Sequence, residues 1–206
     1  MDNKVVVIGG GGHAKVVISV LRLAGYQPVV VLDDFEALWG TNLLGVPVRG
    51  PISSADTKSY DKGIIAVGRN DLRQKLAAHF KLSWVTAIHP TAWVDPSVVL
   101  GPGTVVFAGA MIQSGTVVGD HVIINTGATI DHDCQIRNFV HVAPGVHLAG
   151  KVTLGEGSLM GIAAAAIPGV QIGEWATVGA GGIVIHNLPA RAVAYGVPAR
   201  PRSAIK

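Results

Sequence analysis

Apolar residues in the second part of the chain recur at every sixth position. Between Ile88 and Val184 this spacing has no insertion, and fifteen of the seventeen positions hold Ile, Val or Leu. These anchor positions are Ile88, Val94, Leu100, Val106, Ile112, Val118, Ile124, Ile130, Ile136, Val142, Leu148, Leu154, Met160, Ala166, Ile172, Val178 and Val184. Neither a helix of 3.6 residues per turn nor an alternating strand keeps such a spacing over about 100 residues. The spacing predicts a parallel β-helix, in which six residues form one side of a triangular coil, so that seventeen hexads make between five and six coils.

A second set of inward-pointing positions lies four residues after each anchor. These positions usually hold a small or β-branched residue, and glycines are placed freely between the two sets. The members of this set are Ala92, Thr104, Ala110, Thr116, Ala128, Cys134, Val140, Ser158, Ala164 and Ala176. Such a prism has flat sides, and copies of the chain would bury one side against another through cyclic symmetry. We therefore expect a homotrimer.

The first part of the chain follows a different pattern, in which short apolar runs alternate with helical stretches. Strands are expected at 5–9, 28–34 and 62–68, and helices at 13–25 and 71–80. This order predicts a small parallel α/β unit. The chain is thus expected to divide into an α/β domain at 1–86, a β-helix at 87–188 and a C-terminal tail at 189–206.

Composition narrows the class of protein. Charged residues make up 14% of the chain, and the net charge of +3 contains no run of basic residues, which argues against a nucleic-acid partner. The apolar run at 5–8 ends at four glycines, far short of the roughly 20 residues that a membrane span needs, and no cleavable signal precedes it. We expect a cytoplasmic protein with no membrane span. Cys134 is the one cysteine and forms no internal disulfide.

The turn after the first expected strand has the residues of an anion site. Residues 9–15 read GGGGHAK, so bare backbone could approach a ligand and the following helix could hold a phosphate. Gly9, Gly11 and Ala14 satisfy the loose pattern G-x-G-x-x-[GA], and Asp33 follows nineteen residues after Ala14. Fewer than 90 residues precede the repeat, so a Rossmann-like half domain with a single nucleotide fits best. The alternative, that the glycines serve a tight turn alone, stays open.

The segment IDHDC, residues 130–134, places a histidine between two carboxylates. His132 lies two positions after one inward residue and two before another, so its side chain should leave the core. A general base needs a pKa near neutrality and a carboxylate that orients its ring, and Asp131 and Asp133 are both candidates. The alternative is a solvated surface patch.

The repeat resembles that of the hexapeptide acyltransferases, and LGPGTV and VGDHVI are good copies of it. IDHDC resembles the I-E-H-E-C segment of nucleotide-sugar acetyltransferases that acetylate a 4-amino sugar before bacterial glycan assembly. The resemblance runs from VVVIGGGGHA to GVPAR and implies a left-handed β-helix that binds acetyl-CoA. It also implies that His132 is the base and that Asp133 raises its basicity, although aspartate replaces the family's glutamate and has a shorter reach.

The same resemblance implies two binding sites. His141 would contact acetyl-CoA, Gly150 would lie near the thioester oxygen, and Ile162 and Ala180 would line the cofactor groove, unless these last two simply pack the wall. Because one chain does not easily bring His132 and His141 together, the site is expected between subunits. The residues implied to hold the UDP part of the substrate are Gly11, Gly12, His13, Asp33, Asp34, Gly68 and Asn70. Arg69 stands where the family more often has asparagine.

We therefore expect an acetyl-CoA-dependent N-acetyltransferase that acts on the 4-amine of a UDP-linked amino-dideoxy sugar and needs no metal. O-acetylation of a sugar such as sialic acid is a close alternative. A metal-dependent hydratase would use His141 and His147 but lacks a third ligand in register, and a non-enzymatic nucleotide-binding scaffold is a further alternative. The remaining histidines are expected at the solvated surface: His79, His89, His121, His147 and His186.

Overall fold

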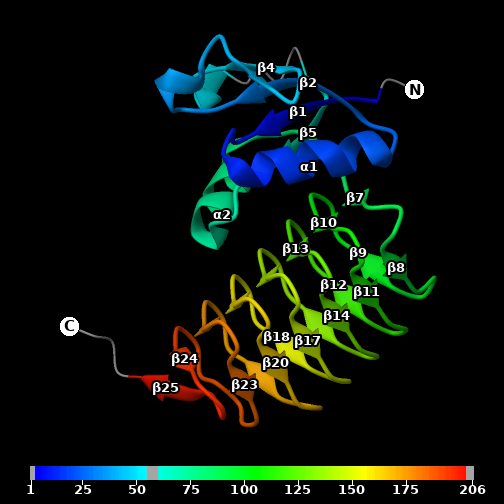
Figure 1. Ribbon diagram of the computed structural model, residues 1–206, viewed down its shortest axis with the longest axis vertical. Coiled ribbons are helices and arrows are strands. Elements are labelled where there is room, and N and C mark those ends of the chain that lie inside the picture. Colours follow the sequence, from blue (N-terminus) through cyan, green and yellow to red (C-terminus); the bar gives the residue numbers. More distant parts are fainter. Residues whose placement is uncertain (1–2, 55–59, 203–206) are drawn as a thin grey trace. The chain divides into compact units, whose positions relative to one another are not determined.

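The computed structural model describes residues 3–54 and 60–202 (Figure 1). The chain forms two compact units, and the boundary between them follows Pro90.

The N-terminal unit is a six-stranded sheet in the order β3-β4-β2-β1-β5-β6. Its elements are β1 (Lys4–Ile8), α1 (Gly12–Leu23), β2 (Gln27–Leu32), the 3-10 helix η1 (Glu36–Leu38), β3 (Asn42–Leu43), β4 (Val46–Arg49), the 3-10 helix η2 (Ile52–Ser54), β5 (Lys62–Ile65), α2 (Asn70–His79) and β6 (Ser83–Trp84). All neighbouring strands are parallel except the hairpin of β3 and β4. The predicted parallel α/β unit is confirmed, and the sequence pattern missed the hairpin and β6.

The central strand β1 explains why this sheet forms. Its residues Val5–Ile8 are fully buried, as a parallel strand covered on both faces requires. Beyond it, Gly9 has a φ of 104°, and a Cβ there would lie 3.1 Å from the carbonyl oxygen of Ala66. Only glycine fits such a conformation and such a close approach. Because β1 pairs with β2 on one side and β5 on the other, the strand order reverses here, where ligands of open α/β sheets bind.

The second unit is built from two-residue strands that repeat every six residues. After β7 (Ala87–Ile88) they are β8 (Trp93–Val94), β9 (Val99–Leu100), β10 (Val105–Val106), β11 (Met111–Ile112), β12 (Val117–Val118), β13 (Ile123–Ile124), β14 (Thr129–Ile130), β15 (Gln135–Ile136), β16 (His141–Val142), β17 (His147–Leu148), β18 (Thr153–Leu154), β19 (Leu159–Met160), β20 (Ala165–Ala166), β21 (Gln171–Ile172), β22 (Thr177–Val178) and β23 (Ile183–Val184). Two three-residue strands follow outside this spacing, β24 (Val193–Tyr195) and β25 (Arg200–Arg202). Each of β8–β20 pairs in parallel with the strand eighteen residues further on, as Ile123 does with His141. One coil therefore takes eighteen residues, and the predicted parallel β-helix is confirmed.

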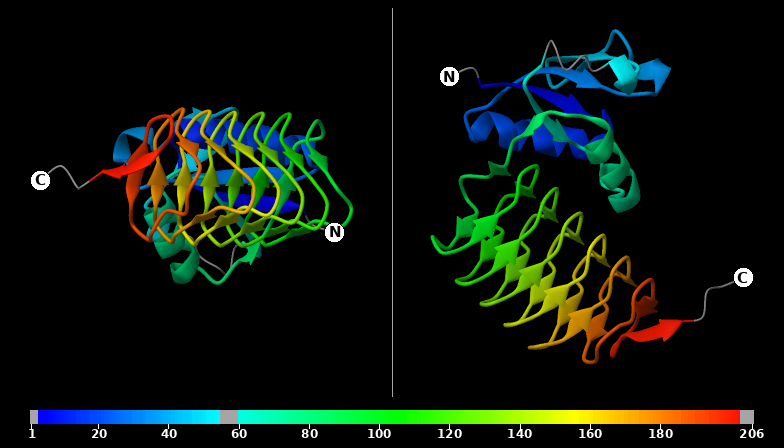
Figure 2. Two further views of the ribbon diagram at one scale, coloured as in Figure 1. Left: turned by 90° about the horizontal axis from the view of Figure 1, so that it is seen from below. Right: turned by 180° about the vertical axis from the view of Figure 1, so that it is seen from behind.

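The coils stack into three faces, which Figure 2 shows along the length of the unit. The first face contains β8, β11, β14, β17, β20 and β23, and the second contains β9, β12, β15, β18 and β21. The third face contains β10, β13, β16, β19, β22 and β24. Since β24 pairs with β22, the coil continues beyond residue 188, and the predicted tail at 189–206 includes a further strand of it.

The interior of the coil holds the two sets of positions that the sixfold spacing predicts. From Val106 to Val184 every anchor is buried, and so is every residue at the second position from Thr104 to Leu188. The polar members of the second set bond between coils: Thr116 Oγ1 accepts from the amide of Cys134 at 3.1 Å and donates to the carbonyl of Asp131 at 3.0 Å. Small inward side chains therefore fill the narrow prism and connect its coils.

The corners of the prism explain where the glycines fall. From 103 to 181 every sixth residue has a positive φ between 52° and 75°. Eight of these fourteen are glycine, and the others are His121, Asp133, Phe139, Lys151, Ala163 and Trp175. The left-handed conformation costs a non-glycine residue roughly 1–2 kcal/mol, so glycine is favoured at each corner. The expectation that glycines are placed freely was wrong.

His121 is not at the solvated surface, so this expectation was also wrong. It is 4% exposed, and its ring stacks on that of Phe139 with a centroid distance of 5.4 Å. The two residues are eighteen apart, so the stack joins corresponding corners of adjacent coils. His79, His147 and His186 are exposed as expected, and His89 is half-buried.

Candidate active site

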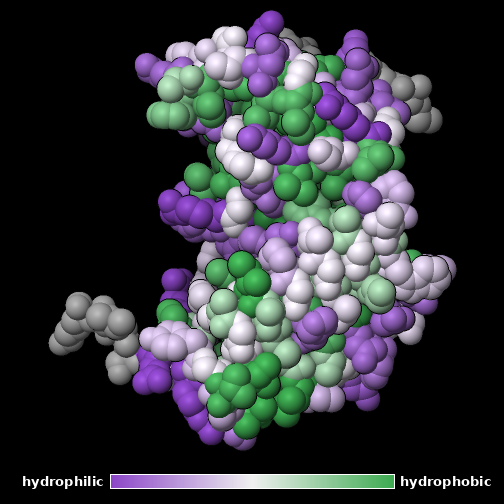
Figure 3. Space-filling model, viewed as in Figure 1, coloured by the Kyte–Doolittle hydropathy of each residue, from purple (hydrophilic) through white to green (hydrophobic). Residues whose placement is uncertain are grey.

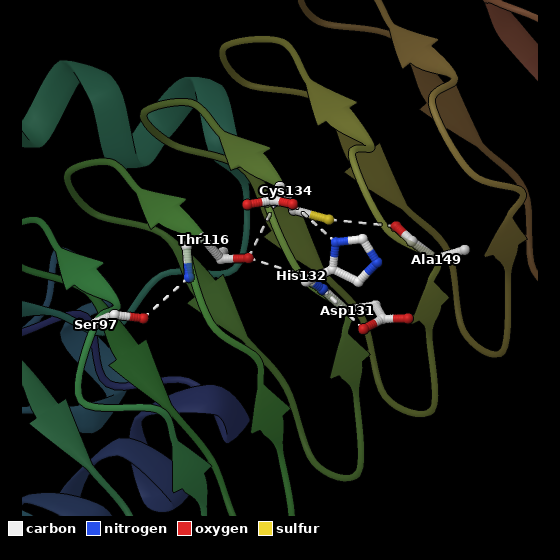
Figure 4. A network of polar contacts seen from close by, with 8 residues as sticks. Ser97, Thr116, Asp131, His132, Cys134 and Ala149 are labelled. Carbon is white, nitrogen blue, oxygen red and sulfur yellow. Dashed lines mark hydrogen bonds and ion pairs between the residues drawn. The ribbon is translucent and has the colours of Figure 1, made fainter.

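His132 occupies the corner between the first and second faces, between β14 and β15. Its Nδ1 lies 2.9 Å from Oδ2 of Asp133, and the two side chains are 52% and 56% exposed. The backbone amide of His132 donates to Oδ1 of Asp131 at 2.8 Å. Figure 4 shows the ring outside the coil while Cys134 turns inward, toward the carbonyl of Ala149. The predicted outward direction of His132 and inward direction of Cys134 are confirmed.

Asp133 makes this contact from a left-handed corner. Its φ is 59°, and its amide donates to the carbonyl of Ser114, one coil below, at 3.0 Å. Aspartate tolerates this conformation better than most non-glycine residues because its short side chain bonds locally. The shorter reach of aspartate, compared with the family's glutamate, is therefore sufficient for the hydrogen bond to His132.

The carboxylate decides which nitrogen of His132 carries the proton. A carboxylate accepts, so Nδ1 donates and Nε2 is left as the acceptor of the neutral ring. Gly150 lies one coil further on at the same corner, and a Cβ there would be 2.5 Å from Nε2 of His132. The missing side chain of Gly150 thus leaves room beside the basic nitrogen.

His141 lies on the third face, as the first residue of β16, and is half-buried. Its Nε2 lies 3.2 Å from Nδ2 of Asn125, which follows β13 in the coil below. Asn125 was missed by the sequence analysis. The eighteen-residue register would have found it, because it places Ile123 beside His141 and Asn125 two residues further along.

One chain does not bring the two histidines together. In a triangular coil, the corner that carries His132 is opposite the third face, where His141 lies. Ile162 and Ala180 lie at the corner between the third and first faces, which is one of the two corners that flank the face of His141. The carbonyl of Ile162 accepts from the amide of Gly181 at 2.8 Å. Ile162 is 59% exposed and Ala180 is also exposed, so neither packs the wall of the prism.

A hollow of about 260 Å³ lies on the first face beside the candidate base. Its lining residues are Met111, Gln113, Thr129, Ile130, Asp131 and Leu148. Asp131, next to His132 in the chain, is one of these lining residues. The first face therefore offers a polar recess at the edge that carries His132.

In the N-terminal unit, the predicted nucleotide-site residues gather at the carboxyl ends of β1, β2 and β5. Gly11 and Gly12 begin α1, and a Cβ on either would meet nothing within 4 Å. The first turn of α1 contains no acidic residue, so its free amides and helix dipole favour an anion.

The acidic pair after β2 holds the loops around this turn. Asp33 accepts from the amide of Gly10 at 2.6 Å and from that of Phe35 at 2.8 Å. Asp34 accepts from the amide of Ile52 at 2.7 Å. Asp34 also lines a hollow of about 330 Å³ together with Ile52, Ser53, Lys75, Leu76 and His79. Part of each carboxylate is thus used to shape the site.

A buried arginine holds the third loop, and the sequence analysis missed it. Arg73 is 1% exposed and donates from Nη1 to the carbonyls of Val67 and Gly68, at 3.0 and 3.2 Å, and from Nη2 to Oδ1 of Asn70 at 2.8 Å. Burial lowers the pKa of Arg73 to about 10, so it stays charged at neutral pH. Arg69 instead pairs at the surface with Asp71, at 2.6 Å.

His13 lies in the first turn of α1, close to this arginine. Burial, together with the charge of Arg73, lowers the pKa of His13 from 6.5 to about 4. The ring is therefore neutral at pH 7. If His13 binds a nucleotide, it does so as a neutral hydrogen-bonding group and not as a cation for phosphate.

Two further findings concern residues 3–54 and 60–202. Within them, no group of three or more His, Cys, Asp or Glu side chains is arranged to hold a metal ion. No helix in this part of the chain combines the length and apolar character of a membrane span.

Residues 4–80 match the family model described as the PglD N-terminal domain. The structure of PerB from Caulobacter crescentus, in complex with CoA and GDP-perosamine, is 44% identical with a TM-score of 0.92, over 97% of each chain. The acetyltransferase domain of PglB from Neisseria gonorrhoeae, in complex with acetyl coenzyme A, is 38% identical with a TM-score of 0.90, over 98% of this chain and 100% of that one.

The curated Staphylococcus aureus protein named "Putative acetyltransferase SAR2635" is 36% identical over 63 residues. The match spans 31% of this chain and 32% of that protein, so the chain covers about a third of the length of this relative. The fold and the matches define a left-handed parallel β-helix of the acyltransferase class, preceded by an α/β domain. The chain belongs to the hexapeptide-repeat family of nucleotide-sugar acetyltransferases.

Proposed function

We propose that this protein transfers an acetyl group from acetyl-CoA to the amine of a nucleotide-linked amino sugar, with His132 as the general base. The observation that carries this proposal is the contact of 2.9 Å between Nδ1 of His132 and Asp133, which leaves Nε2 as the acceptor beside Gly150. The complexes of relatives with CoA, GDP-perosamine and acetyl coenzyme A support the two substrate classes.

The geometry suits a direct transfer. The amine nitrogen attacks the thioester carbonyl, a C–N bond forms, and Nε2 of His132 takes the proton that the amine loses. The carboxylate of Asp133 stabilises the resulting imidazolium, and the amide of Gly150 would meet the oxyanion. The C–S bond then breaks, and the imidazolium returns its proton to the CoA thiolate. Orientation of two bound substrates can contribute roughly 7–11 kcal/mol, more than the base itself supplies.

The sugar is proposed to be a 4-amino-dideoxy sugar used in bacterial glycan biosynthesis, with the nucleotide held by the glycine turn, His13, Asp33, Asp34 and the loop of Gly68 and Asn70. The sequence analysis predicts a UDP-sugar, whereas PerB is in complex with GDP-perosamine. A screen of UDP- and GDP-linked 4-amino sugars with acetyl-CoA, in which products are detected by mass spectrometry, identifies the nucleotide that the enzyme accepts.

The assembly is proposed to be a homotrimer in which one subunit supplies His132 and its neighbour supplies His141. Two observations support it: the two histidines lie on opposite parts of the coil, and large apolar side chains are exposed on its faces. Trp93, Val99 and Met111 are 56%, 59% and 47% exposed. Figure 3 shows further apolar surface over the coils that carry β20 and β23. Ile167, which directly follows β20 in the chain, is 41% exposed. Cytoplasmic location remains a prediction.

The test of the function compares a 4-amino with a 4-hydroxy nucleotide sugar at equal concentration. We expect turnover of the amine and a fall of about 10²–10⁴-fold in the His132→Ala variant, the usual contribution of a general base. Preferential turnover of the hydroxyl would favour a sugar O-acetyltransferase. A His132→Ala variant with full activity would overturn the proposed base, and absence of any turnover with acetyl-CoA would favour a binding scaffold.

A further inference from the structure

The side chain of Asn125 is held by one group whose role is unambiguous. Its Oδ1 lies 2.8 Å from the backbone nitrogen of Thr126, which carries a proton and can only donate. The opposite orientation of the amide would set its NH2 group against this N–H. The orientation of Asn125 is therefore fixed by chemistry: the oxygen faces Thr126, and the nitrogen Nδ2 faces His141.

This orientation determines the protonation of the neighbouring ring. Nδ2 of Asn125 lies 3.2 Å from Nε2 of His141 and has only protons to offer. Nε2 must then be the acceptor, so the proton of the neutral imidazole is on Nδ1. A second proton on Nε2 would meet the amide protons and lose the hydrogen bond, so the cationic form of His141 is disfavoured.

The partner of His132 has the opposite effect. Both rings carry their proton on Nδ1, but the carboxylate of Asp133 stabilises a positive charge on His132, while the amide of Asn125 opposes one on His141. Two groups of one type whose surroundings favour opposite charge states are suited to different roles in one reaction.

We propose that Asn125 is a positioning residue that holds His141 as a neutral, Nδ1-protonated ring, so that His141 binds acetyl-CoA without competing with His132 for the amine's proton. This inference rests on the proposed function, which assigns the acetyl-CoA contact to His141. A neutral donor suits the uncharged carbonyl groups of acetyl-CoA, because it bonds to them without bringing a charge near the ring of His132.

The direct test is the ¹⁵N spectrum of the histidine rings in the intact protein labelled on histidine, with His141→Gln used to assign the signal. We expect Nε2 of His141 to stay unprotonated at every pH between about 5.5 and about 8.5. In Asn125→Asp, a carboxylate faces Nε2, so both nitrogens of His141 should be protonated at neutral pH. A wild-type His141 that carries its proton on Nε2, or whose Nε2 gains a proton within this pH range, would overturn the proposal.

Kinetics separate this role from a merely structural one. Asn125→Ala removes the group that holds the ring of His141, so it should raise KM for acetyl-CoA about tenfold, the effect of one lost hydrogen bond, and leave KM for the sugar nucleotide unchanged. Asn138→Ala is the matched control, since Asn138 Oδ1 also accepts a backbone amide, that of Asp120 at 2.9 Å. It should change neither the ring spectrum nor KM. Equal changes in both KM values, or an Asn125→Ala protein with unchanged KM for acetyl-CoA, would contradict the role.

The two outcomes are independent of each other. The spectrum reports the ring of His141 whether or not any sugar is acetylated, so a protein without turnover but with the expected ring state would refute the proposed function alone. Turnover with a cationic His141 in the wild type would refute this inference alone.

Discussion

Gly150 lies beside the imidazole of His132, one coil further along the same corner of the prism. A Cβ on Gly150 would be 2.5 and 2.6 Å from Nε2 and Cε1 of that ring, closer than real side-chain contacts permit. The φ of Gly150 is not in the left-handed range, so its backbone does not require glycine. Glycine is needed at this position because of the neighbouring ring: a methyl group on residue 150 would occupy the space beside Nε2 of His132.

Gly150→Ala should therefore displace the imidazole and lower kcat without unfolding the protein. We expect a fall of about 10²-fold, which is what a displacement of roughly 1 Å in a reacting group costs. The measurement is steady-state kinetics together with the midpoint of thermal unfolding. Ser114→Ala is the control, since Ser114 occupies the same corner one coil before His132, and it should keep full kcat. Wild-type kcat in Gly150→Ala would show that the ring does not need this space.

Asp133→Asn tests the charge of the carboxylate and not its shape. Asparagine also tolerates the left-handed corner and can still accept from Nδ1, but it does not stabilise an imidazolium. We expect kcat to fall about tenfold or more while KM for both substrates stays within about twofold, as for an interaction made in the transition state. Asp131→Asn should affect kcat less, because Asp131 Oδ1 accepts from the backbone of His132 and not from its ring. The reverse order would identify Asp131 as the partner of the base.

The lowered pKa of His13 predicts that the folded protein loses stability in acid. Its pKa is lowered from 6.5 to about 4 in the folded chain, so between these values the unfolded chain binds the proton and the folded chain does not. The free energy of unfolding should therefore fall as the pH drops from 6.5 to about 4, by up to about 3 kcal/mol from this group. Urea unfolding of wild type and His13→Asn at several pH values isolates the contribution. Parallel pH curves for the two proteins would contradict the assignment.

Arg73→Met should weaken the binding of the nucleotide sugar and not that of acetyl-CoA. The variant removes the three hydrogen bonds that hold the carbonyls of Val67 and Gly68 and the side chain of Asn70. We expect KM for the nucleotide sugar to rise about tenfold, because loops left with buried unsatisfied groups lose their arrangement. Arg69→Met, which removes only the exposed pair with Asp71, is the matched control and should leave KM unchanged. A similar rise in both variants would point to general charge and not to loop positioning.

Replacing either of two exposed alanines by glycine should change the free energy of unfolding, and the two changes should be of opposite sign. Ala163 occupies a left-handed corner with a φ of 55°, whereas Ala78 lies in α2. Ala163→Gly should stabilise the protein by about 0.5–1 kcal/mol, since relief of the left-handed strain exceeds the greater freedom that glycine gives the unfolded chain. Ala78→Gly should destabilise it by up to about 1 kcal/mol. Denaturant unfolding measures both, and a loss of stability in Ala163→Gly would show that the corners carry no strain.

The sequence by itself determined the coil, the α/β unit and the outward direction of His132. A triangular β-helix repeats one local rule, so Ile130 and Cys134 point inward because of their place in the hexad, and every residue between them is placed as well. The strands of the α/β unit were predictable for a similar reason, because an apolar run such as Val5–Ile8 indicates a buried strand without reference to the rest of the chain.

The tertiary structure decided what depends on neighbouring coils and loops. Gly150 contacts the ring of His132, eighteen residues away, and Asn125 contacts the ring of His141, sixteen residues away. The sixfold period does not say which side chains face one another. His121 was misplaced because its outward position is covered by Phe139, and Arg73 was missed because a charged residue in a helix normally faces water. Local spacing fixes directions along the chain, whereas burial, tautomer and pKa depend on what the fold packs against each group.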